Sequence, residues 1–232
     1  AAKYLAETRR FAGRVALIFQ PAEESGGGGR IMCEEGVMDR FAIREVYGLH
    51  NAPGQAFGSF ATRPGPLMAA VDTFEITIRG QGGHGARPHE TRDPVAAAVQ
   101  IAQAFQTIVS RNAYAGDRLV VSLTQIHAGS ADNIIPAEAW MNGTIRTFRK
   151  EVQEMVRSRM EAICRGIGEA MAVEVDFAYV HGYPATVNDE GRTLFAADVA
   201  RDVAGAAGVD LTIDPDMGAE DFSYMLEERP GC

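Results

Sequence analysis

The sequence predicts an α/β fold into which a smaller α+β module of ferredoxin-like order is inserted. Two observations predict it. Near the start, a short apolar run, a helical stretch and a second apolar run follow one another, as in a β-α-β unit. Further on, strand and helix patterns follow in the order β-α-β-β-α-β, the split arrangement of ferredoxin-like domains. The 232 residues are enough for one large domain or two moderate ones.

Three stretches predict the first β-α-β unit. Residues 14–19 (RVALIF) and 45–50 (EVYGLH) are apolar runs of strand type, and residues 27–39 between them suit a helix. In a parallel sheet, ligands bind beyond the carboxyl ends of the strands. The segments PAEESGGGG and LHN follow those ends, so their polar side chains are candidates for a functional site.

A second pattern begins near Met68, after the segment GSFATRPGP. The strand pattern VDTFEITIRG is followed by a helical stretch with Pro94 in its first turn, two strand patterns, a long helical stretch and the strand pattern VEVDFAYV. We expect an antiparallel sheet with both helices on one face and with edge strands open to a partner. From YPATVND onward helix and strand alternate again, so residues 1–67 and 182–232 are assigned to one discontinuous domain and residues 68–181 to the insertion.

Composition and charge argue against several classes of protein. The chain is 46% hydrophobic and 23% charged, and it has no apolar run near the roughly 18 residues that a membrane span requires. Its net charge of -9 and its scattered lysines and arginines leave no basic face for nucleic acid. Three widely spaced cysteines are typical of a reducing compartment. We therefore expect a cytoplasmic protein that binds neither nucleic acid nor membranes.

The segment FQPAEESGGGGR, residues 19–30, joins two adjacent glutamates to four glycines. A phosphate-binding loop of the form G-x-x-x-x-G-K-S/T places a lysine after the glycines, whereas here they follow two anions and precede Arg30, which disfavours a nucleotide site. The glycines let the backbone turn sharply and approach a ligand closely. Glu23 and Glu24 point in different directions if the strand continues through them, but in a turn both can face one cleft.

Two carboxylates held close together force one to keep a proton, unless a divalent cation neutralises one and leaves the other as a general base. That division of labour suits metal-assisted hydrolysis. A catalytic zinc binds about three protein ligands and a water molecule, and Glu24 with His50 supplies two of these ligands. The alternative for the Glu pair is a solvated loop, and the alternative for each lone histidine is a surface or hydrogen-bonded role.

Six segments together resemble the zinc-dependent amidohydrolases and peptidases that include hippurate hydrolase, aminoacylase, indoleacetyl-amino-acid hydrolase and carboxypeptidase G. The segments are FQPAEESGGGGR, VYGLHN, ATRPGPLMAAVDTFEITIRGQGGHGARPHETRDPVAAA, NIIPAEAWMNGTIRTF, YPATVND and MGAEDFSYM. They span nearly the whole chain and are most similar to the hippurate and indoleacetyl-amino-acid hydrolases. The resemblance implies an α/β metallohydrolase catalytic domain with an inserted ferredoxin-like lid and dimerisation domain.

The resemblance also implies roles for individual residues. Glu23 matches the general base, which takes a proton from metal-bound water, and Glu24 and His50 match metal ligands. His84 matches a histidine that reaches from the lid, across a dimer, into the active site of the other subunit. There it would polarise the scissile carbonyl group and stabilise the oxyanion.

Three more residues are expected near the substrate. Asn133 in DNIIP matches a lid residue near the substrate, Arg146 in GTIRTF matches one that holds the substrate carboxylate, and Glu220 in GAEDFSYM is expected close to the site. By pattern alone, Asn133 also suits a turn former and Arg146 a solvated cross-strand partner. Asp221 can cap a helix, and Cys33 is a candidate for the core rather than for a ligand.

The family pattern includes segments that these 232 residues do not contain, namely an upstream Cys-Gly-His-Asp-Gly-His stretch and a last ligating histidine downstream. The chain is therefore expected to be an internal piece of a longer enzyme, with both ends of its catalytic domain truncated. It should hold two of about five metal ligands and bind a metal weakly or not at all. The complete active site is expected to hold two divalent ions, with Zn, Mn, Co and Ni all compatible with these ligands.

The predicted function is hydrolysis of the amide bond of a hippurate-like N-acyl amino acid by metal-activated water, in a homodimer formed through the lid domain. One alternative is a metallo-dipeptidase or carboxypeptidase of the same family, since pocket shape decides between these substrates. The other is a catalytically incomplete dimerisation module, for which the open edge of the inserted sheet is the motive.

Overall fold

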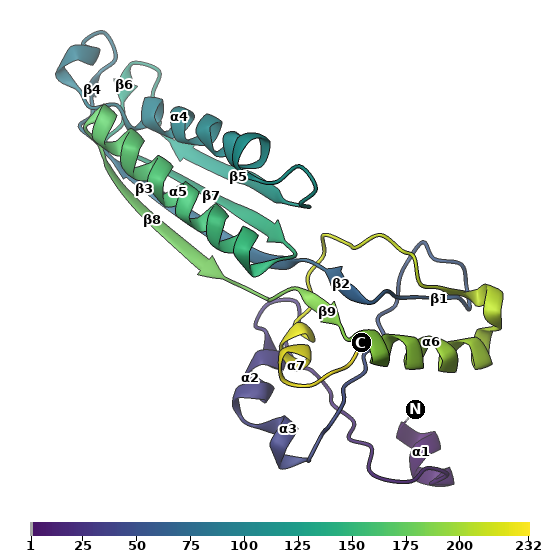
Figure 1. The fold of residues 1–232 in the computed structure, drawn as a ribbon. Coiled ribbons are helices and arrows are strands. Elements are labelled where there is room, and N and C mark those ends of the chain that lie inside the picture. Colours follow the sequence, from purple (N-terminus) through teal and green to yellow (C-terminus); the bar gives the residue numbers. More distant parts are fainter. Residues whose placement is uncertain (1) are drawn as a thin grey trace. The chain divides into compact units, whose positions relative to one another are not determined.

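The computed structural model describes residues 2–232, which divide into two compact units (Figure 1). Unit 1 contains the described residues up to Gly65, together with Val187–Ile213 and Glu220–Cys232. Unit 2 contains Pro66–Thr186 and Asp214–Ala219. The chain passes from unit 1 to unit 2 within β2 (Gly65–Met68) and returns within β9 (Thr186–Asn188).

Unit 2 is built on a four-stranded antiparallel sheet with the strand order β5-β7-β3-β8. Its strands and helices, in chain order, are β3 (Ala70–Arg79), β4 (Gly83–His84), the 3-10 turn Pro88–Glu90, α4 (Pro94–Thr107), the π-helical turn Ile108–Asn112, β5 (Val120–Ala128), β6 (Ile134–Ile135), β7 (Glu138–Thr147), α5 (Lys150–Met171) and β8 (Glu174–His181). Strands β5 and β8 therefore form the two edges of the sheet.

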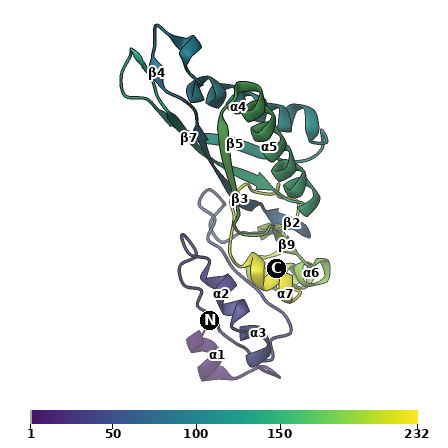
Figure 2. The same cartoon turned by 90° about the vertical axis from the view of Figure 1, so that its left-hand side faces the viewer.

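Both long helices cover the same face of this sheet (Figure 2). Burial alternates along β3 and β7, as expected when one face of a sheet is packed and the other is not. The packed face of β3 contributes Phe74, whose ring meets that of Phe105 on α4 edge-on, with the ring centroids 5.5 Å apart. The buried residues of this core are Phe74, Ile76, Ile78, Ala97, Ala98, Ile101, Phe105, Ile108, Leu119, Val121, Ala139, Met141, Ile145, Val152, Val156, Met160, Cys164 and Val173.

Helix α4 begins at Pro94, the position that the sequence predicts for the first helical turn. The side chain of Asp93 caps it by accepting hydrogen bonds from the backbone N–H groups of Val95 and Ala96. Such a cap satisfies amides that have no partner inside the helix, and proline needs no partner there because it has no N–H.

The short strands β4 and β6 pair at one end of the sheet (Figure 1). Glycines make this close packing possible. A Cβ atom on Gly80 would lie 2.0 Å from the carbonyl oxygen of Arg92, and one on Gly82 would lie 2.6 Å from that of Ile135. The glycine-rich segment before His84 is therefore required by backbone packing inside unit 2.

Unit 1 is mostly short helices and irregular segments. Its elements are α1 (Ala2–Thr8), α2 (Gly28–Glu34), α3 (Val37–Arg40), β1 (Phe60–Ala61), α6 (Glu190–Ala204), the 3-10 turn Ala206–Gly208, β10 (Val209–Asp210) and α7 (Ser223–Glu228). Strands β1 and β10 form a parallel pair. The buried core contains Cys33 with Val37, Met38, Val46 and Met225, so the prediction that Cys33 is a core residue is confirmed. Burial also raises the pKa of its thiol to about 11.

The prediction of a β-α-β unit over residues 14–50 is wrong for its two strands. Residues 14–19 form no strand, and in 45–50 only Val46 makes a bridge, to Gly231. Three side chains of the first run are exposed, Val15 by 49%, Leu17 by 48% and Phe19 by 81%. A strand needs a neighbour that shares its ladder of hydrogen bonds, and no strand within residues 2–232 pairs with residues 14–19.

The helix predicted for residues 27–39 is present as two helices, α2 and α3. The break falls at Gly36, whose φ of 79° lies in the left-handed region that glycine adopts without strain. Among the helices of residues 2–232, none combines the length and the apolar composition that crossing a membrane requires.

The Phe74–Phe105 contact predicts a large effect of one substitution. Phe105→Ala should lower the free energy of unfolding of unit 2 by about 3–5 kcal/mol, because it leaves a cavity in a fully buried site. Trp140, the single tryptophan, lies on β7 and reports urea unfolding of this unit by its fluorescence. Phe57→Ala is the matched control: that side chain is fully exposed, so a change within about 0.5 kcal/mol is expected. Equal effects of the two substitutions would contradict the assigned core.

Candidate active site

Glu23 and Glu24 lie in a tight turn before α2. The backbone N–H groups of Gly26 and Gly27 both donate to the carbonyl oxygen of Ala22, at 2.8 Å and 3.0 Å. Ala22 and Gly27 have φ values of 53° and 59°, so the backbone reverses through two left-handed positions. Of the two alternatives that the sequence left open, a continued strand or a turn, the structure has the turn. Glu23 is half-buried in it and Glu24 is exposed.

The last two glycines of the run are required by close approach. A Cβ atom on Gly28 would lie 1.9 Å from the carbonyl oxygen of Pro21, and one on Gly29 would lie 2.8 Å from Oδ1 of Asp221. The close approach that these glycines allow is therefore to the protein's own Pro21 and Asp221. Any larger residue would push the start of α2 away from them.

The environment of this turn displaces the pKa of the Glu23 carboxyl group. Burial raises the pKa of Glu23 above its ordinary value, and repulsion from Glu220, Glu24 and Asp221 raises it further. The backbone N–H of Asp221 donates a hydrogen bond to Glu23 and lowers the pKa in part. Carboxylates from two distant segments, residues 23–24 and 220–221, are therefore close enough to interact.

His50 contacts the same group of carboxylates. Its Nε2 atom lies 3.7 Å from Oε2 of Glu220, while its Nδ1 atom lies 2.7 Å from the carbonyl oxygen of Asn51. A carbonyl oxygen can only accept, so Nδ1 carries the hydrogen in that contact. In the neutral ring the lone pair is then on Nε2, the atom beside Glu220. The ring is 66% exposed, and Glu220 is 16% exposed.

Asp221 lies at the bottom of this group, with no exposed surface. Its Oδ2 atom accepts the backbone N–H of Gly29 at 2.6 Å, and its Oδ1 atom accepts Nε2 of Gln20 at 2.5 Å. Asp221 therefore caps the start of α2. The cap predicted for it is present, but at a helix almost two hundred residues earlier in the chain. Sequence reasoning did not identify Gln20, because nothing in its neighbourhood indicates this contact.

Two other predicted residues meet at the β4–β6 end of unit 2. His84 pairs with Ile134, and the N–H of Gly85 donates to the carbonyl oxygen of Asn133 at 2.8 Å, so His84 and Asn133 lie on adjacent strands. Both are exposed. The N–H of Ala86 donates to Nδ1 of His84 at 3.1 Å. In the neutral ring the hydrogen therefore resides on Nε2, which can act as a donor.

Arg146 lies at the opposite end of the same sheet. It is on β7, between Val71 on β3 and Val120 on β5, and it belongs to the face that the helices leave uncovered. Eight residues along β7 separate it from Glu138, where that strand reaches the β4–β6 end. At about 3.4 Å per residue the separation is about 27 Å. The structure therefore does not bring Arg146 together with His84 and Asn133 within one unit 2.

The residues around the turn fit a divalent metal in kind. Carboxylate oxygens and an imidazole nitrogen are ligands for Zn and Mn, and in the neutral ring His50 carries a lone pair on Nε2. However, within residues 2–232 no group of three or more His, Cys, Asp and Glu side chains is arranged to hold a metal ion. The described residues alone therefore do not form a complete metal site.

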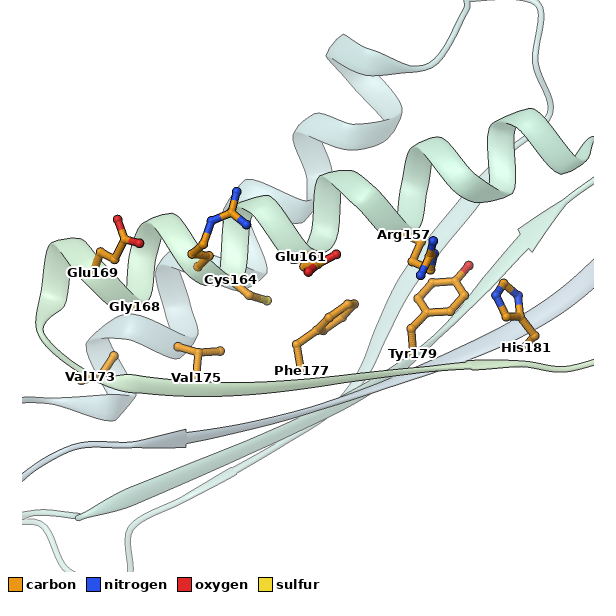
Figure 3. Close-up of a pocket in the computed structure, with 11 residues that line it drawn as sticks. Arg157, Glu161, Cys164, Gly168, Glu169, Val173, Val175, Phe177, Tyr179 and His181 are labelled. Atoms are coloured by element: carbon orange, nitrogen blue, oxygen red, sulfur yellow. The ribbon is translucent and has the colours of Figure 1, made fainter.

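A cavity of about 610 Å³ lies elsewhere, between α5 and the edge strand β8 of unit 2 (Figure 3). Val175 and Phe177 of β8 line one side of it, and Cys164, Glu161 and Arg157 of α5 line the other. None of the seven residues predicted for the active site lines it. Strand β8 is an edge of the sheet, so the cavity lies at the sheet edge.

An α/β chain with a carboxylate–histidine group at a helix start has the side chains of a hydrolase that works with a divalent metal. Comparison with known proteins identifies the family. The model of the family described as Peptidase family M20/M25/M40 matches residues 1–232. The chain belongs to this family.

Relatives of known name support this assignment. The chain is 40% identical over 219 residues to an N-acetylcysteine deacetylase of Bacillus subtilis, covering 94% of this chain and 56% of the relative. It is 36% identical over 229 residues to the hippurate hydrolase of Campylobacter jejuni, covering 99% of this chain and 60% of that relative. The chain thus spans little more than half the length of these relatives.

A solved structure agrees with the fold. The YXEP protein of Bacillus subtilis, described as a dinuclear metal binding peptidase from the M20 family, superimposes with a TM-score of 0.80 at 33% identity. The match covers 99% of this chain and 58% of that structure. The mixed α/β fold is thus that of the family.

The raised pKa of Glu23 predicts a pH-dependent stability in the presence of a chelator. Because its pKa is higher in the folded than in the unfolded chain, the folded chain binds more protons between the two values, and stability falls as pH rises through them. Glu23→Gln should therefore raise the thermal midpoint at neutral pH, and the gain should shrink as the pH is lowered below 4.5, the ordinary value. Glu75→Gln, at an exposed position on β3, is the control and should show no such trend. Destabilisation at neutral pH by Glu23→Gln would contradict the repulsion.

Proposed function

We propose that the protein to which this chain belongs is a metal-dependent amidohydrolase that cleaves the amide bond of N-acyl amino acids. The main support is a cluster of interacting side chains in unit 1, in which the pKa of Glu23 is raised. The cluster consists of Glu23, Glu24, Glu220 and His50. A carboxyl group tuned upward and surrounded by potential metal ligands is the arrangement a general base needs near neutral pH. The names of the two enzymes reported above, a deacetylase and a hippurate hydrolase, support the substrate class.

In this proposal the side chains divide the work. Glu24 and His50 would hold the metal, His50 through Nε2 because Nδ1 is bonded to the carbonyl oxygen of Asn51. The proposed cofactor is a divalent metal, with two ions in the complete site. The element is Zn, Mn, Co or Ni, and the bound ion would lower the pKa of its water molecule. Glu23 takes a proton from the attacking water and delivers it to the leaving amine. Glu220, beside His50, borders the space for the substrate.

The residues of unit 2 are proposed to bind the substrate. His84 can donate from Nε2 to the oxygen of the scissile carbonyl group, since Nδ1 already accepts from Ala86. Asn133, on the adjacent strand, offers an amide to the same region. Arg146 suits the substrate carboxylate, because a guanidinium group pairs with it through two parallel hydrogen bonds.

A homodimer formed through the insertion, here residues 68–181, completes this proposal. An N-acyl amino acid is much shorter than the roughly 27 Å that separates Arg146 from the β4–β6 end of the sheet. One copy of unit 2 therefore cannot present both Arg146 and His84 to one substrate, whereas two copies related by two-fold symmetry can. Residues 1–67 and 182–232 are the proposed catalytic domain, and the insertion is its proposed lid.

Two other functions are kept as alternatives. A relative named thermostable carboxypeptidase 2, from Saccharolobus solfataricus, is 39% identical over 222 residues, which favours a peptidase of the same family as the second candidate. A catalytically incomplete dimerisation module is the third, since the described residues complete no metal site. The cytoplasm is the proposed compartment, because all three cysteines are free.

Hippurate hydrolysis with added Zn or Mn tests the catalytic proposal. It is measured on this chain and, where the natural protein is longer, on that protein. Glu23→Gln should lower kcat by about a hundredfold to ten-thousandfold with the metal content unchanged, because it removes a general base but no ligand. Loss of metal together with activity would make Glu23 a ligand instead. Full activity of the variant would overturn its assignment, and an inactive wild type that forms dimers would favour the third candidate.

Mixing two inactive variants tests the dimer. If each site takes His84 from one copy and Arg146 from the other, His84→Ala and Arg146→Ala subunits together form mixed dimers with one intact site. Random exchange of subunits should then restore about a quarter of the wild-type activity. Each variant alone should stay inactive. No recovery on mixing, with subunit exchange shown by mass spectrometry of labelled chains, would contradict the shared site.

A further inference from the structure

The Asp221 side chain bonds to residues on either side of the Glu23–Glu24 turn in the sequence. One of its oxygens accepts from Gln20, before the turn, and the other accepts from the backbone N–H of Gly29, after it. A fully buried carboxylate is costly unless its oxygens are hydrogen-bonded, and bonds to a charged acceptor are roughly twice as strong as neutral ones. These two bonds therefore join the two ends of the segment that carries both glutamates.

The sequence around Gly29 is adapted to this contact. Because a Cβ atom there would lie 2.8 Å from Oδ1 of Asp221, only glycine lets the amide approach to 2.6 Å. Gly26, three residues earlier, has more room: its Cβ atom would meet the Cβ atom of Ala22 at 3.2 Å and no charged group. Gly26 and Gly29 thus offer a matched pair in which only one substitution disturbs Asp221.

A third bond from Asp221 reaches Glu23 directly, since the backbone N–H of Asp221 donates to the Glu23 carboxylate. The residue before it, Glu220, contacts His50. One dipeptide therefore joins the ends of the turn through the Asp221 side chain and bonds to the proposed base through a backbone amide. Its Glu220 carboxylate lies 3.7 Å from the proposed ligand His50.

We propose that Asp221 is a positioning residue, which orients Glu23 for proton transfer by holding Gln20 and Gly29 together beneath it. This inference rests on the proposed function for its catalytic consequence, but its structural part does not depend on it. Both carboxylate oxygens of Asp221 already accept hydrogen bonds from residues at the ends of the turn. Its carboxylate acts through the turn alone, and its effect should appear in turnover rather than in substrate affinity.

Amide hydrogen exchange tests the structural part on the chain of residues 1–232. Asp221→Asn keeps the shape of the side chain but turns an amide nitrogen toward one of the two donors. The Gly29 amide, or the peptide 20–29 in a mass-spectrometric readout, should exchange at least about tenfold faster in the variant, while the strands of unit 2 keep their protection. Unchanged exchange at Gly29 would overturn the proposal.

Asp72 supplies the matched control. It is also a buried aspartate that accepts from a glutamine side chain, Gln153, and from a glycine amide, Gly182, but in unit 2. Asp72→Asn should cost stability comparably and leave the exchange of residues 20–29 unchanged. If both variants accelerate exchange throughout the chain, Asp221 serves general stability only, and the proposal is wrong.

Kinetics test the catalytic part wherever the wild type hydrolyses hippurate. Asp221→Asn and Gly29→Ala should each lower kcat at least about tenfold, with KM within about twofold of the wild type. Asp221→Ala should lower kcat further. The controls Gly26→Ala and Asp72→Asn should change kcat and KM less than these variants do. A rise in KM with kcat unchanged would place Asp221 in substrate binding. If neither this chain nor the natural protein to which it belongs hydrolyses hippurate, the proposed function fails, while the exchange result still decides whether Asp221 holds the turn.

Discussion

Four carboxylates gathered at the start of α2 repel one another, and the local structure of unit 1 follows from how each charge is accommodated. Asp221 is buried against two hydrogen-bond donors, whereas Glu220 faces Nε2 of His50, which carries a lone pair in the neutral ring and donates no hydrogen to it. Glu24 remains exposed to water. Glu23 is both partly buried and surrounded by like charge, and its pKa rises as a result. A base with a raised affinity for protons is thus a consequence of the crowding, and a nearby cation is what would relieve it.

The elements of unit 2 were predictable because each carries its own signal. Alternation predicts β3 and β7, Pro94 marks the start of α4, and the helical period predicts α5 over its 22 residues. The strands expected at residues 14–19 and 45–50 carry an equally clear apolar pattern, yet they are absent. Apolar composition records that a segment prefers burial, whereas a strand also needs partners for its backbone. Those partners are not a local property, so a local pattern could not supply them.

The candidate site divides in the same way. The adjacency of Glu23 and Glu24 and the position of His50 could be read from the sequence, because the chemistry resides in residue types. The contact of Asp221 with Gly29 joins residues 192 positions apart, and no spacing rule predicts it. The separation of Arg146 from His84 follows once the pairing of β3 with β7 is known, because their ten residue pairs fix which end of the sheet each residue occupies. The separation could not be calculated from the sequence, because the sequence pattern alone leaves the strand register undetermined.

The two histidines assigned to the proposed site show how one backbone contact can set a side chain's task. The Nδ1 atom of His50 faces a carbonyl oxygen and must donate, which leaves a lone pair on Nε2. The Nδ1 atom of His84 faces an amide N–H and must accept, which leaves a hydrogen on Nε2. The first tautomer suits metal binding and the second suits donation to an oxyanion. Exchanging these two contacts would leave composition and charge unchanged and would deprive both residues of their proposed roles, so the chemistry depends on the main chain beside each ring as much as on the rings themselves.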